Sequence, residues 1–75
     1  MQFVAERNIR DTLRQAQVEK AKVTVYLRSG ATFTGLVKDS HDHHVILTEL
    51  AGRELFDALI QIEDISALET RVRNS

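Results

Sequence analysis

The spacing of hydrophobic residues changes at Lys22, and this change restricts the fold more than any other feature of the chain. The stretch before Lys22 has the 3.6-residue period of an amphipathic helix, which we expect over about residues 5–19. The apolar stripe of this helix consists of Ala5, Ile9, Leu13 and Ala16. From Lys22 onward apolar and polar residues alternate, as in half-buried strands. The chain is therefore expected to begin with one helix and to continue as β structure.

Short turns divide the alternating part into five strands. RSGA and AGR supply two tight turns, and the polar run KDSHDHH separates a strand at about residues 32–39 from VILTEL. Gly35 inside that strand predicts a sharp bend or a close backbone approach. ELFDALIQI and EDISALE are expected to form the last two strands. The sequence thus predicts a mainly β fold with an N-terminal α-helix, a strongly bent five-stranded antiparallel small barrel.

The expected organisation is a single domain over residues 1–75, because the chain has no Pro, no linker-like stretch and no internal repeat. It divides into the helix at about 5–19, the barrel at about 22–69 and a polar tail at 70–75. The expected barrel core consists of Val23, Val25, Leu27, Phe33, Val37, Val45, Leu47, Ile62 and Ile65.

Self-association is expected from the size of the chain and from its fourth strand. A domain of 75 residues buries little surface, and without cysteine it has no disulfide to stabilise it. The segment FDALIQI is apolar on both faces, whereas one small core covers only one. We expect a neighbouring subunit to cover the other face.

Composition excludes several classes of protein. Charged residues make up 28% of the chain and its apolar runs are short, so no membrane span is predicted. The N-terminus becomes charged too early for a signal peptide, which predicts a cytoplasmic protein. The net charge is −1, but residues 22–69 contain four basic and eight acidic side chains, a net charge of −4. That acidic segment argues against a general nucleic-acid binder, since phosphate binding depends on positive potential.

Two groups of side chains are candidates for function. Arg7, Arg10 and Arg14 form a stripe on the helix that is either a solvated face or a surface for a phosphate backbone. All three histidines lie in SHDHHV, residues 40–45. His41 and His43 give a metal at most two ligands from one chain, and neither a nucleophile motif nor a phosphate-binding loop accompanies them. No cofactor, no metal site and no enzymatic activity are expected.

The segment VTVYLRSGATFTGLVKDSHDHHVILTEL resembles the first signature of Sm-like (LSm) proteins, and in detail that of the bacterial Hfq family. The alternating strand before Gly30, the glycine at 35 and the motif DHHVIL carry the resemblance. IQIEDISALE is similar to the second signature, so that the resemblance covers about residues 5–69. It implies an Sm-like (SH3-like) barrel that assembles as a homo-oligomeric ring of five to seven subunits, with six favoured.

The resemblance also implies binding of single-stranded RNA and a role in post-transcriptional regulation. His44 takes the place of the family's base-stacking residue, next to His43 as a polar contact and Asp42 as the loop aspartate. Ile62 and Glu63 replace the family's basic pair, however. The alternative is an Sm-like structural or protein-interaction module that has lost conventional RNA binding.

Overall fold

The computed structural model describes residues 5–70, with side chains from residue 8 onward. Helix α1 (Ala5–Glu19) occupies the predicted range. Leu13 and Ala16 of its apolar stripe are buried in the core. The helix ends because Lys20 adopts a left-handed conformation (φ 56°), which lets the Ala21 N–H donate to the Ala16 carbonyl at 3.0 Å. This turn leads directly into the first strand.

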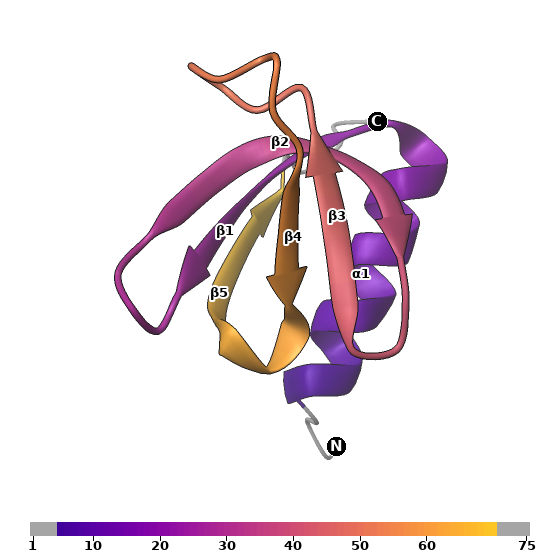
Figure 1. Ribbon diagram of the computed structural model, residues 1–75. Helices are drawn as coiled ribbons and strands as arrows, with labels where there is room; N and C mark the ends of the chain where they lie inside the picture. Colours follow the sequence, from indigo (N-terminus) through magenta and orange to yellow (C-terminus); the bar gives the residue numbers. More distant parts are fainter. Residues whose placement is uncertain (1–4, 71–75) are drawn as a thin grey trace.

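Five antiparallel strands follow the helix and form one strongly bent sheet (Figure 1). The strands are β1 (Lys22–Leu27), β2 (Thr32–Ser40), β3 (His44–Thr48), β4 (Ala58–Gln61) and β5 (Ile65–Thr70), with a 3₁₀ turn, η1 (Ile62–Asp64), between the last two. Their order across the sheet is β4-β3-β2-β1-β5. In the described chain β4 and β5 do not pair with each other, so the barrel-like sheet keeps two open edges.

One hydrophobic core lies between α1 and the curved sheet. Its buried residues are Leu13, Ala16, Val23, Val25, Val37, Val45, Leu47, Leu50, Ile60, Ile62 and Ile65. Leu27 and Phe33, which were expected inside, are half-buried and pack against this core. The predicted alternation of β1 and β3 is confirmed, since Val23, Val45 and Leu47 are almost fully buried.

Gly35 is a point of close backbone approach, as its position in a strand predicted. A Cβ atom built on Gly35 would lie 2.5 Å from the Thr48 carbonyl oxygen and 3.2 Å from Leu50 Cδ2. The Ala51 N–H also donates to the Thr34 carbonyl at 2.8 Å. The end of β3 and the following loop therefore lie directly on the bend of β2.

The fourth strand is shorter than predicted. The sequence indicated a strand over residues 54–62, but β4 contains only Ala58–Gln61. The preceding segment leaves the sheet because Leu50 turns into the core and bridges to Arg53, whose guanidinium lies 5.2 Å from the centre of the Phe33 ring. Leu55 and Phe56 are consequently exposed in a loop.

The second hairpin is also tighter than predicted. Residues 40–44 were expected to form the loop between two strands, but β2 continues to Ser40 and His44 is the first residue of β3. Only residues 41–43 form the turn, which the His41 N–H closes by donating to the His44 carbonyl at 2.8 Å. Among residues 5–70, no helix has the length and apolar character needed to cross a membrane.

Candidate functional site

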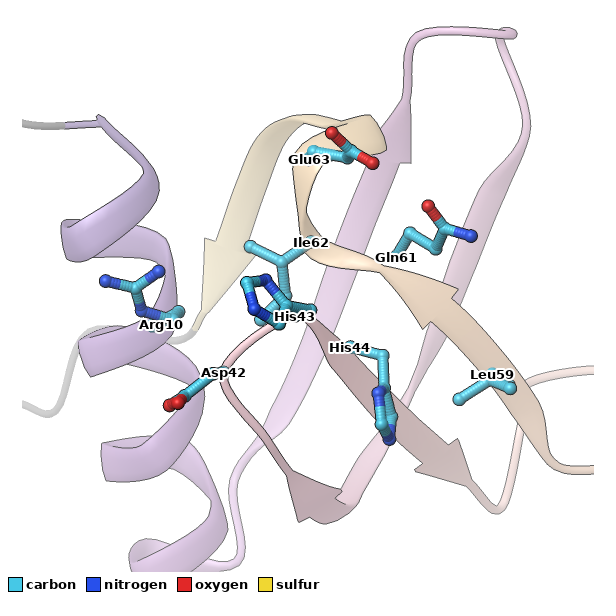
Figure 2. A pocket seen from close by; sticks show the side chains of 8 residues that line it. All are labelled: Arg10, Asp42, His43, His44, Leu59, Gln61, Ile62 and Glu63. Carbon is cyan, nitrogen blue, oxygen red and sulfur yellow. The ribbon is translucent and has the colours of Figure 1, made fainter.

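An open pocket with a volume of about 540 Å³ lies where the turn at 41–43 meets the end of β4 (Figure 2). Its lining combines one helix residue with residues of the turn at 41–43, β3, β4 and η1. These residues are Arg10, Asp42, His43, His44, Leu59, Gln61, Ile62 and Glu63. The pocket thus brings together four of the six side chains that the sequence singled out.

Strand pairing fixes the position of His44 in this pocket. A bulge between Val37 and Asp39 shifts the register of β2 against β3, after which Ser40 pairs with Val45. On the other side of β3, His44 pairs with Gln61. Since Val45 is buried and side chains alternate along a strand, His44 and Gln61 lie on the outer face of the sheet.

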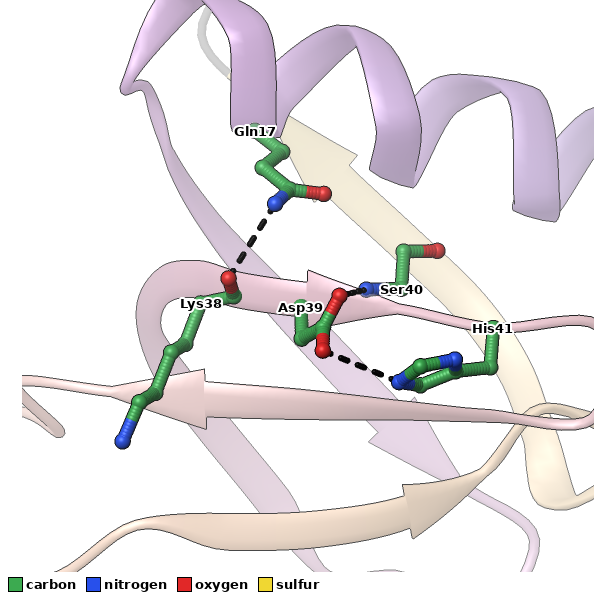
Figure 3. Close-up of polar contacts among 5 residues, drawn as sticks. All are labelled: Gln17, Lys38, Asp39, Ser40 and His41. Carbon is green, nitrogen blue, oxygen red and sulfur yellow. Dashed lines mark hydrogen bonds and ion pairs between the residues drawn. The ribbon is translucent and has the colours of Figure 1, made fainter.

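His41 supports the His44 ring. The centres of the two imidazoles lie 4.6 Å apart with the planes tilted by 36°. His41 Nε2 also lies 3.0 Å from Asp39 Oδ2, and the other Asp39 oxygen accepts from the Ser40 N–H at 3.0 Å (Figure 3). The His41 side chain is half exposed. The contact places the two imidazole rings side by side at the edge of the pocket.

The two described arginines of the helix stripe have different surroundings. Arg10 lines the pocket from the helix side, across from the turn that carries Asp42 and His43 (Figure 2). Arg14 lies 3.7 Å from Asp42, and both side chains are well exposed, so this ion pair is weak. It nevertheless places a counter-charge beside Asp42. Arg7 belongs to α1, but its side chain lies outside the described residues.

A second anchor joins the helix to the long strand β2. Gln17 Nε2 donates to the Lys38 carbonyl at 3.1 Å, at the bulge of β2 (Figure 3). This bond satisfies a carbonyl at the irregular point of the ladder. It also fixes α1, and with it Arg10 and Arg14, relative to the strand that leads into the histidine turn.

Sequence patterns did not identify Leu59 and Gln61 as pocket residues. Both lie on the outer face of β4 opposite β3, where Leu59 pairs with Ile46. Leu59 is 69% exposed, which is unusual for an apolar side chain of its size. The sequence does show that this strand is apolar on both faces. That pattern predicted that a neighbouring subunit covers the outer face, and it did not predict a pocket there.

The pocket is suited to stacking and hydrogen bonding more than to attracting anions. Arg10 is its one arginine, whereas Asp42 and Glu63 both contribute carboxylates. The imidazoles, the Gln61 amide and the apolar Leu59 supply a planar surface, polar atoms and a hydrophobic wall. Among the described residues no three histidine or acidic side chains are grouped so that they could hold a metal ion.

Comparisons with known proteins identify the fold. No protein-family profile and no curated protein sequence matches the chain. A solved structure does match: the crystal structure of Hfq, described as a pleiotropic translational regulator, superimposes with a TM-score of 0.70 and 24% sequence identity. The match covers 92% of this chain and all of the Hfq chain. The helix followed by five antiparallel strands is therefore an Sm-like fold close to that of Hfq.

Proposed function

Given this Sm-like fold, we propose that the chain is a ring-forming protein that binds single-stranded RNA in post-transcriptional regulation in the cytoplasm. The observation that carries the proposal is the pocket in which His43, His44 and Arg10 lie together. In this proposal the imidazole of His44 stacks on a base, since unpaired RNA bases are commonly held on aromatic side chains. His43 makes a polar contact to the same nucleotide. Arg10 contacts the phosphate backbone.

The remaining helix arginines extend the proposed phosphate surface. Arg7 and Arg14 belong to the same stripe as Arg10, and the Arg14 side chain is 59% exposed. Asp42 lines the same pocket and, in this proposal, makes a polar contact at the edge of the base site. The protein binds and does not catalyse, since stacking and phosphate contacts need no reacting group.

The open sheet edges and exposed apolar residues support assembly into a ring. β4 and β5 each have one unpaired edge, and an unpaired edge is a template for another strand. Leu55, Phe56 and Leu59 are exposed in or next to β4. A β4 edge that pairs with β5 of the next copy would cover these residues and repeat head to tail, which closes into a ring. Six subunits are favoured, within a range of five to seven.

The proposal is tested by titrating labelled oligo-U and oligo-A into the wild type, His44→Ala and His44→Phe at low salt. Stacking predicts that His44→Ala binds about tenfold or more weakly, because a stacked base contributes about 1–3 kcal/mol. His44→Phe keeps an aromatic face and should retain most of the affinity. Equal binding by all three proteins would move the site away from His44. Light scattering tests the ring by measuring the mass of the particle in solution. A mass close to the 8.5 kDa of one chain would contradict assembly.

A second candidate is a protein-interaction module of the same fold without RNA affinity. The carboxylate of Glu63 in the pocket and the net charge of −4 over residues 22–69 favour this candidate. It predicts that neither oligonucleotide binds the wild type at micromolar concentration.

A further inference from the structure

Glu63 introduces an unpartnered carboxylate into the base pocket. It lines the pocket with the two histidines, it is exposed, and it has no hydrogen bond or ion pair with any side chain that the structure describes. A carboxylate in a nucleic-acid pocket repels phosphates, so it weakens binding unless the bound base offers donors to it. Building on the proposed RNA function, we propose that Glu63 reads the Watson–Crick edge of guanine and makes the pocket selective for guanine over uracil.

The backbone holds Glu63 at a fixed place relative to the histidines. The Ile62 N–H donates to the His43 carbonyl at 2.9 Å, which ties the 3₁₀ turn to the histidine turn. Ile62 is only 3% exposed and anchors the same turn in the core. One residue before it, Gln61 pairs with His44. The carboxylate is therefore carried by a rigid segment that borders the stacking surface.

The hydrogen-bonding capacity of a carboxylate selects among the four bases. An ionised carboxylate has two acceptor oxygens and no donor. Guanine presents two adjacent donors, N1–H and the N2 amine, which one carboxylate can accept together. Uracil presents a single N3–H between two carbonyl oxygens, and both of these oxygens repel a carboxylate. Adenine and cytosine each present one exocyclic amine beside a ring nitrogen that accepts hydrogen bonds, so only one of the two carboxylate oxygens finds a donor.

Gln61 complements this selection. In Figure 2 its carboxamide and the Glu63 carboxylate lie at the same end of the pocket. The Gln61 amide can donate to the O6 atom of guanine, which lies beside N1–H on the same edge of the base. The His44 ring lies at the opposite end of the pocket in Figure 2, so a base stacked on it would have to extend across the pocket to place this edge against Gln61 and Glu63. Uracil in the same place would leave the Glu63 carboxylate opposite a carbonyl oxygen, which adds repulsion to the loss of a bond.

Three single-stranded RNA hexamers test the proposal: oligo-U, a hexamer of alternating uridine and guanosine, and the same hexamer with inosine for guanosine. Inosine lacks the N2 amine but keeps N1–H, so it removes one of the two donors. We expect the wild type to bind the guanosine hexamer about tenfold or more tightly than oligo-U, with the inosine hexamer between them, because a bidentate contact discriminates by about 1–3 kcal/mol. Fluorescence anisotropy at constant salt measures all three affinities.

Glu63→Gln is the matched variant, since glutamine has the same length but one acceptor and one donor. The ratio of guanosine to uridine affinity should fall to about one in this variant, while the mass of the assembly stays unchanged. A ratio of one in the wild type, or an unchanged ratio in Glu63→Gln, would overturn the guanine preference and leave the RNA function standing. If Glu63→Gln binds oligo-U and the wild type binds nothing, Glu63 blocks RNA and the preference is wrong. Absence of binding by both proteins to all hexamers would overturn the RNA function and this inference together.

Discussion

Replacement of Gly35 by alanine should destabilise the protein strongly. The added Cβ would lie 2.5 Å from the Thr48 carbonyl oxygen, well inside van der Waals contact. That oxygen belongs to the backbone of β3, which pairs with β2 through Leu36 and Thr48, so it cannot rotate away as a side chain would. The strands must separate or the bend in β2 must open. Overpacking of this kind costs about 1–3 kcal/mol, and a rigid backbone partner favours the upper end.

The thermal midpoint should fall accordingly. In a domain of this size 1 kcal/mol corresponds to about 4–8 °C, so a loss of about 3 kcal/mol lowers Tm by about 12–24 °C. Circular dichroism measures this shift, at one protein concentration because the proposed assembly would add its own stabilisation. Gly30→Ala is the matched control: Gly30 has φ +97° but no atom within 4 Å of an added Cβ. It should lose about 1–2 kcal/mol from backbone strain alone. If Gly35→Ala loses no more than Gly30→Ala, the close contact with Thr48 does not determine the fold at this point.

Two further predictions concern the acid stability and the assembly of the protein. Hydrogen bonds with Thr48 and then Lys38 lower the pKa of Asp57, whose Oδ2 lies 3.2 Å from Lys38 Nζ. The resulting stabilisation is present above the pKa of an unfolded aspartate, roughly 4, and is lost as the pH falls through the lower folded-state pKa. The difference in urea midpoint between wild type and Asp57→Asn should therefore shrink from pH 6 to pH 3, and a constant difference would contradict the lowered pKa. Leu59→Lys places a charge beside the β4 edge and should therefore reduce the mass measured by light scattering. Val18→Lys on the exposed helix face is the control and should leave the mass unchanged. Equal masses for the two variants would exclude this edge from the interface.

The sequence predicted most of the fold because the spacing of hydrophobic residues shows directly which side of a helix or strand is buried. The helix and β1 appear where the period is 3.6 and 2 respectively. The strand predicted for residues 54–57 was wrong, because alternation of apolar and polar residues cannot distinguish a strand in the sheet from an extended loop. What removed this segment from the sheet was the turn of Leu50 into the core, a tertiary contact. The same limitation placed His44 in a loop and not in β3.

The candidate site was only partly predictable for a related reason. The three histidines within residues 40–45 made the turn a candidate site in the sequence. The family resemblance singled out Glu63, because it stands where the family has a basic residue. Gln61 and Leu59 became pocket residues only through the register that places His44 opposite Gln61. Register depends on where the bulge in β2 falls, and no single-residue preference in the sequence marks that position.

If the open edges of the sheet pair between copies as proposed, the stability of each subunit depends on its neighbours. In the proposed ring every copy donates one strand edge and receives another, so a broken contact leaves two unpaired edges on different subunits. Folding and assembly are then linked by mass action, and the apparent melting temperature rises with protein concentration. One subunit with a blocked β4 edge would interrupt the ring for all the others. A defective copy present as a minority would therefore act dominantly over the wild type.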